Sequence, residues 1–156
     1  MKKSLLALLL MATFALTFTG CKKDEEENTP DITENSWSID GIKYELSNSL
    51  LKPSFSGVSL SAFGNGSNLL IKFASKPTTS GTYTLKAITA ELAGMECSVT
   101  ATVDKDLYYS VGNSGEVVKV TVSGDKVRAE ISKVTLESTV EGATKKASLS
   151  ANILEN

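Results

Sequence analysis

Apolar and polar residues alternate on both sides of a Gly-Asp pair in the stretch Val118-Lys-Val-Thr-Val-Ser-Gly-Asp-Lys-Val-Arg-Ala-Glu-Ile131, and this pattern indicates the fold class. Alternation with a period of two is typical of β-strands that bury one face. Glycine and aspartate are turn residues, so the two halves are predicted to form a hairpin. In its register all apolar residues share one face: Val118, Val120 and Val122 lie opposite Ile131, Ala129 and Val127.

Five further predicted turns have the same property: the register that each turn sets keeps the apolar residues of both flanking strands on one face. Ile131 and the next apolar residue, Val134, are three positions apart, which breaks the alternation with a period of two. This break predicts a β-bulge near Ser132-Lys133. Six consistent hairpins predict an all-β fold, an antiparallel up-and-down meander of about ten strands that closes as a barrel or a two-sheet sandwich. We assign this single β domain to residues 36–156. The five turns are Asp40-Gly41, Asn65-Gly66, Asp104-Lys-Asp106, Asn113-Ser114 and Glu141-Gly142.

The segment 88–95 has two alternative predictions. It either continues the strand expected over residues 82–87 or forms one helical turn at Ala90-Glu-Leu-Ala93, which Gly94 ends.

Four aromatic residues fall on the inward face in the predicted register: Trp37, Tyr44, Tyr83 and Tyr109. The position of Tyr109 follows from the three-residue loop at 104–106, which places it opposite Ala101 and leaves Tyr108 outward. Core packing is the default role for such side chains. The alternative is that they line a cavity for an apolar ligand, as in eight-stranded barrels.

The first 35 residues have a different character. Lys2 and Lys3 precede an apolar run from Leu5 to Phe18, which is too short to span a bilayer (about 20 residues) but suits a signal peptide. We predict a signal peptide over residues 1–20, lipidation of the following Cys21, and a disordered acidic tether over residues 21–35. The lipid on Cys21 then holds the protein at a membrane.

The sequence Phe18-Thr-Gly-Cys21 resembles the bacterial lipobox, and the run Lys22-Lys-Asp-Glu-Glu-Glu27 resembles a surface-export signal. With the opening Trp37-Ser-Ile-Asp-Gly-Ile-Lys-Tyr44, these features resemble small Bacteroidetes-type surface lipoproteins of unassigned function. The resemblance implies an all-β domain anchored in the outer membrane and facing the medium, or otherwise the periplasm. It implies no site residues.

The composition argues against several kinds of chemistry. The 156 residues include no histidine, so the commonest general base and metal ligand is missing. Asp104 and Asp106 share a loop, but no further oxygen ligands follow at a fixed spacing, and we predict no metal site and no cofactor. The net charge of −2 comes without a basic patch, so a nucleic-acid partner is not expected. Cys97 is predicted to be a small buried apolar residue.

We therefore expect a non-enzymatic binding module for a glycan, a small apolar ligand or a partner protein. The alternative is a structural or assembly-accessory lipoprotein of the cell envelope that has no small-molecule ligand. A cavity with a few convergent polar groups favours the first expectation, and a solid core without a cleft favours the second.

Overall fold

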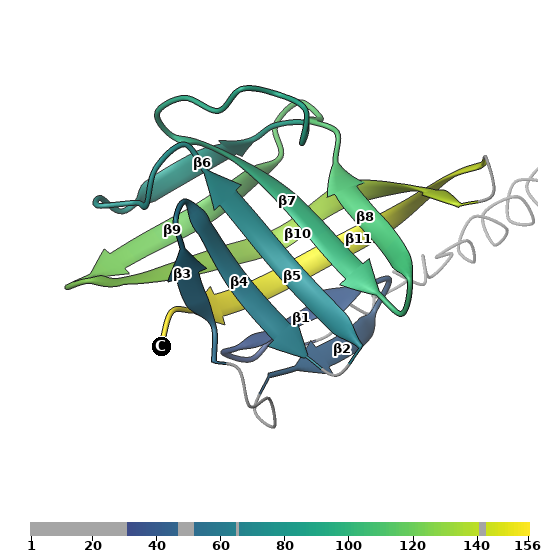
Figure 1. Ribbon diagram of the computed structural model, residues 1–156, viewed down its shortest axis with the longest axis horizontal. Helices are drawn as coiled ribbons and strands as arrows, with labels where there is room; N and C mark the ends of the chain where they lie inside the picture. The colour runs from purple at the N-terminus through teal and green to yellow at the C-terminus, as the bar shows by residue number, and fades with distance from the viewer. Residues whose placement is uncertain (1–30, 47–51, 65, 141–142) are drawn as a thin grey trace, which may run out of the picture.

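The computed structural model describes residues 31–46, 52–64, 66–140 and 143–156 (Figure 1). Within these ranges the chain forms eleven β-strands and no helix. All of these strands belong to one sheet, so the all-β prediction is confirmed. The predicted signal peptide, Cys21 and the turn residues Asn65, Glu141 and Gly142 lie outside the described residues.

The strands differ greatly in length, and the last two form one long hairpin. In chain order they are β1 (Ser36–Ile39), β2 (Ile42–Glu45), β3 (Ser54–Ser56), β4 (Ser59–Gly64), β5 (Ser67–Phe73), β6 (Gly81–Leu85), β7 (Glu96–Val103), β8 (Asp106–Ser110), β9 (Val117–Ser123), β10 (Lys126–Val140) and β11 (Ala143–Leu154).

The sheet runs in the order β2-β1-β11-β10-β9-β6-β7-β5-β4-β3, and β8 joins β7 to β10 beside this path. Strands β6, β7, β8, β10 and β9 thus form a closed ring of pairings. In Figure 1, strands β4, β5 and β7 cross in front of β10, β11 and β1. This curled, partly closed sheet agrees with the predicted barrel or sandwich.

The order of the strands departs from a simple meander at β6. This strand pairs with β9 on one side and lies parallel to β7 on the other. A parallel pair needs a long connection so that the chain can return in the same direction, and residues 86–95 supply it. This segment holds turns and bends, with the Ala90 N–H donating to the Ala87 carbonyl oxygen at 3.0 Å. Neither the predicted strand extension nor the predicted helical turn is correct.

The local registers around the short turns are largely as predicted. Val120 pairs with Ala129 and Val122 with Val127 across the Gly124-Asp125 turn. The β10–β11 register shifts between Ile131 and Val134, which confirms the bulge. The pairs Trp37–Tyr44, Ile39–Ile42, Leu60–Ile71, Ala62–Leu69, Leu136–Ala147 and Val134–Leu149 are also confirmed.

One predicted hairpin forms in a different register, and another does not form. Strands β7 and β8 are joined by the two-residue turn Asp104-Lys105, with Asp104 at φ 56°, so that Val103 pairs with Asp106. Because side chains alternate along a strand, this one-residue shift inverts all of β8. The turn at 113–114 does not pair β8 with β9; β8 pairs with β7 and β10 instead.

The core is one cluster of apolar side chains enclosed by the curled sheet. Strands β4, β5 and β7 contribute Leu60, Ile71 and Val99, and the strands behind them in Figure 1, β1 and β11, contribute Trp37 and Leu149. All five are at most 1% exposed. Burial on this scale is the main favourable contribution to folding, at about 25 cal/mol for each Å² of apolar surface removed from water.

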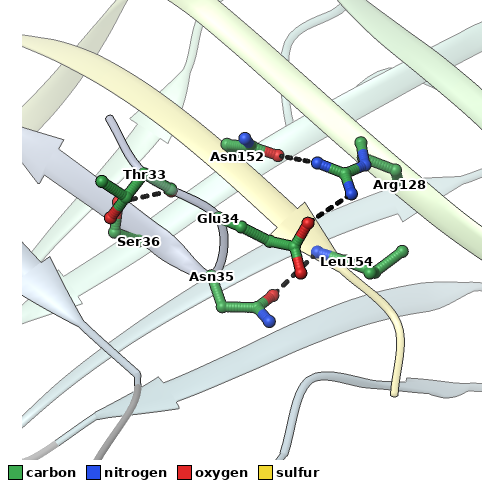
Figure 2. Close-up of polar contacts among 7 residues, drawn as sticks. All are labelled: Thr33, Glu34, Asn35, Ser36, Arg128, Asn152 and Leu154. Carbon is green, nitrogen blue, oxygen red and sulfur yellow. Dashed lines mark hydrogen bonds and ion pairs between the residues drawn. The ribbon is translucent and has the colours of Figure 1, made fainter. Parts of the chain in front are cut away.

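The residues just before β1 are bound to the far end of the chain (Figure 2). The backbone N–H of Asn35 donates to the Asn152 carbonyl oxygen at 2.8 Å, and the Leu46 N–H donates to the Asn35 carbonyl oxygen at 3.0 Å. Arg128 Nη2 forms an ion pair with Glu34, and its Nη1 donates to Asn152 Oδ1 at 3.3 Å. Glu34 and Asn35, which the sequence analysis assigned to the tether, therefore contact the β domain.

Candidate functional site

Two of the four predicted inward aromatic residues lie together. Trp37 on β1 is fully buried, and its ring stacks on that of Tyr44 on β2, with ring centroids 4.5 Å apart and planes inclined by 23°. Offset stacking of this kind contributes about 0.5–1.5 kcal/mol beyond the burial of area. Tyr44 is half-buried, and burial raises its pKa, as do the nearby Asp104 and Tyr108.

Tyr83 is inward as predicted but belongs to another part of the core. It packs edge-on against Phe73, with ring centroids 5.3 Å apart at 85°. Burial is the main reason that its pKa is raised, and Cys97 adds to the effect. Both rings are buried side chains of the core, so this pair serves packing.

The prediction for Tyr109 is wrong, because the shorter turn at Asp104-Lys105 rotates β8. Tyr109 lies on the outer face, where its hydroxyl is 3.0 Å from Thr139 Oγ1. Its neighbour Tyr108 is inward and only 4% exposed. The run Leu107-Tyr-Tyr109 is apolar at every position, so alternation alone does not determine which tyrosine faces inward.

Tyr108 reaches toward the exposed end of the β10–β11 hairpin. Lys145 Nζ donates to the Tyr108 hydroxyl at 3.1 Å and lies 5.7 Å from the ring centroid. This hydrogen bond raises the pKa of Lys145, and the negative charges of Asp40 and Asp106 add to the effect. The ammonium is therefore held by groups of this chain.

A surface pocket of about 390 Å³ lies elsewhere, between the end of β6 and the segment that follows β8. One side of its lining is Thr84 and Leu85 of β6 with Lys86, Ala87 and Ala90, and the other side is residues 111–115. This volume is in the range of about 300–1,000 Å³ that is typical of small-molecule sites. The sequence analysis missed the pocket. Its only sequence signal is the cluster Gly112-Asn-Ser-Gly115, which reads as a turn.

One side-chain and one backbone hydrogen bond hold the two walls of the pocket together. Ser110 Oγ donates to the Lys86 carbonyl oxygen at 2.6 Å, and Leu85 N–H donates to the Glu116 carbonyl oxygen at 3.0 Å. Ala87 and Val111 form an isolated β-bridge. Gly112, at φ 77°, passes so close to this bridge that a Cβ atom would lie 2.8 Å from the Ala87 nitrogen. The walls are therefore positioned by the ring and not by free loops.

The polar groups that line the pocket are mostly uncharged. Within the described chain, no hydrogen-bond partner is found for the side chains of Thr84, Asn113 and Ser114. Lys86 is the charged residue of the lining, and its Nζ lies 3.3 Å from Glu96 Oε1. The Ala93 N–H and Lys86 hold the pKa of Glu96 below its usual value. The pocket therefore offers free hydroxyl and amide groups beside a neutralised ion pair.

Other residues singled out in the sequence show no site geometry. Cys97 is fully buried and forms no disulfide within the described chain, and burial raises its pKa to about 12. The described residues contain no group of three or more acidic or cysteine side chains placed to hold a metal ion, and Asp104 and Asp106 are part of no such group. In the same residues no helix is long and apolar enough to cross a membrane.

Comparisons with known proteins give no match. Models of protein families, curated proteins and solved structures all fail to align with this chain.

Proposed function

We propose that this protein is a non-enzymatic binding domain of the cell envelope, anchored to the outer membrane by lipid on Cys21. The observation that supports binding is the pocket of about 390 Å³ between residues 84–90 and 111–115. It combines small apolar groups with unpartnered hydroxyl and amide groups, as ligand sites commonly do. Its lining contains no arrangement of a nucleophile and a base, and the chain has no histidine.

The anchoring part of the proposal is supported by the N-terminal sequence, in which a positive n-region, an apolar run and small residues precede Cys21. The acidic run Asp24-Glu-Glu-Glu27 supports display on the outer surface, as in the surface lipoproteins that it resembles.

The anchor is tested with Cys21→Ser and with alanine replacement of residues 24–27. We expect Cys21→Ser to abolish incorporation of labelled palmitate and to release the protein from membranes or leave the precursor uncleaved. The alanine variant keeps the lipid but loses its exposure to protease added to whole cells. A Cys21→Ser protein that is still processed and membrane-bound contradicts lipid anchoring.

The binding role is tested with the full chain and a variant whose pocket is filled, Ser114→Trp. Ser114 is exposed in a turn, so the fold tolerates the larger side chain. Arrays of glycans and lipids, together with pull-downs from intact envelope, should show a ligand that the variant fails to retain. Equal retention by both proteins argues against the pocket as the binding site.

A second candidate function is docking to a partner protein within the envelope, as an accessory of an assembly. The observation that favours it is a row of residues across the outer face of four strands, Phe63–Asn68–Thr102–Leu107. Phe63 is 40% exposed and Leu107 is 49% exposed. Replacement of both by serine should abolish such a complex and leave binding in the pocket unchanged.

A further inference from the structure

We infer that the pocket beside β6 binds an uncharged carbohydrate, an inference that rests on the proposed binding function and narrows its ligand class. The first argument is the balance of charge. Lys86 is the only charged residue in the lining, and Glu96 neutralises it at 3.3 Å. A ligand with a net charge would have to compete with this ion pair, whereas a neutral ligand leaves it in place.

The second argument is the chemistry of the unpartnered groups. Thr84 and Ser114 present hydroxyls and Asn113 presents an amide, and each of these groups both donates and accepts hydrogen bonds. Sugar hydroxyls also do both, so each contact is satisfied in either direction. These three groups are exposed to water, and an apolar ligand that covers them displaces this water without offering hydrogen bonds, which disfavours its binding.

The third argument is the shape and the size of the lining. Ala87, Ala90 and Val111 provide small apolar surfaces that suit the C–H face of a sugar ring. Gly112 and Gly115 have no side chain, so the ring can approach the backbone closely. A volume of about 390 Å³ accommodates one or two sugar rings.

The test uses the full chain in detergent micelles and follows the backbone amide signals by NMR during titrations. The probes are neutral sugars (glucose, N-acetylglucosamine, maltose and mannobiose), the charged analogue glucuronate, and cyclohexanol, which has a similar ring but only one hydroxyl. We expect at least one neutral sugar to shift the signals of residues 84–87 and 111–115 saturably. Glucuronate and cyclohexanol should bind at least tenfold more weakly.

Matched variants connect the binding to the pocket. Thr84→Val removes a hydroxyl of the lining and keeps its shape, so the Kd should rise about threefold to tenfold. Thr82→Val is the control, because Thr82 is also exposed on β6 but lies outside the lining. Ser114→Trp should abolish the shifts. Its amide spectrum away from the pocket should remain that of the wild-type protein.

The outcomes separate this inference from the proposed function. If glucuronate or cyclohexanol shifts the pocket signals and no neutral sugar does, the carbohydrate inference is overturned while a binding function stands. If no probe moves these signals, both the inference and the assignment of binding to this pocket are overturned. Equal effects of Thr84→Val and Thr82→Val also overturn the inference.

Discussion

The side-chain oxygen Oδ1 of Asn35 accepts a hydrogen bond of 2.9 Å from the backbone N–H of Leu154, 119 residues later in the chain (Figure 2). Asn35 immediately precedes β1, and Leu154 is the last residue of β11. The bond therefore joins the entry of the β domain to its final strand. Asn35 adopts φ 57°, a left-handed conformation that asparagine tolerates better than most residues.

The first prediction separates the two roles of Asn35. Asn35→Gly removes the acceptor but suits the backbone, and it should lower the free energy of unfolding by about 1 kcal/mol. Asn35→Ala also places a Cβ atom in the left-handed region, so we expect a total loss of about 2–3 kcal/mol. Urea denaturation measures both losses. A glycine variant as stable as the wild type would show that the hydrogen bond to Leu154 contributes nothing.

The second prediction concerns the two faces of β9. Val120 is 1% exposed, so Val120→Asp buries a charge and should cost several kcal/mol of the roughly 5–15 typical of a domain. Thr121 is exposed, and Thr121→Asp should cost about 0.5 kcal/mol or less. Val117→Lys is the apolar control, because Val117 is 42% exposed. Urea melts in which all three variants are equally damaged would contradict a strand with one buried face.

The third prediction tests the corrected register of β8. Tyr108 is buried and bonded to Lys145, so Tyr108→Ala should lower the free energy of unfolding by about 3–5 kcal/mol. Tyr109→Ala removes an outward side chain and should cost about 1 kcal/mol or less. Chemical denaturation compares the two variants. If Tyr109→Ala were the less stable variant, the result would support the three-residue loop at 104–106 and an inward Tyr109.

The fourth prediction concerns the close approach of the Gly112 and Ala87 backbones, which belong to the two walls of the pocket. Gly112 and Gly115 both have positive φ, so alanine strains the backbone at either position. Only at Gly112 does the new Cβ atom meet backbone, 2.8 Å from the Ala87 nitrogen, whereas nothing lies within 4 Å at Gly115. Gly112→Ala should therefore be less stable than Gly115→Ala by about 1–3 kcal/mol. Equal thermal or urea stability of the two variants would show that the walls separate freely.

The fifth prediction follows from the pKa of Cys97, which burial raises from 9.0 to about 12. Between these pH values the unfolded chain has released the thiol proton and the folded chain has not. The unfolded state then binds fewer protons, so the free energy of unfolding falls as pH rises, by at most about 1.4 kcal/mol per pH unit for this group. The stabilising contribution is complete below pH 9 and lost toward pH 12.

Urea melts over this pH range, with Cys97→Ala as the control, measure the contribution of the thiol. The variant should have a shallower pH dependence than the wild type. Identical slopes would contradict a raised thiol pKa. Thiol reagents at pH 8 should also label Cys97 only after unfolding, because the reactive thiolate is scarce and the side chain is buried in the folded state.

Much of the β structure was predictable because its causes are local. The turn at Asp40-Gly41 has positive φ at both residues, as a two-residue turn of this composition favours. This turn fixes the pairing of Trp37 with Tyr44, which are only seven residues apart in the chain. The Gly124-Asp125 hairpin and the bulge after Ile131 are likewise encoded by alternation within single segments. Trp37 and Tyr83 were placed correctly in the core for the same reason.

Local sequence patterns therefore specify the all-β class, the position of most turns and the inward face of most strands. The way in which these hairpins join is set by the closure of the sheet, where β6 lies between β9 and β7, and β8 pairs with both β7 and β10. Those pairings depend on how the entire curled sheet closes, so no short window contains them. The pocket arises from that closure, which brings residues 84–90 against residues 111–115. The alternation of apolar and polar residues also does not determine which face of β8 is inward, because Leu107, Tyr108 and Tyr109 are all hydrophobic. Tyr108 is buried because the turn before β8 is one residue shorter than predicted.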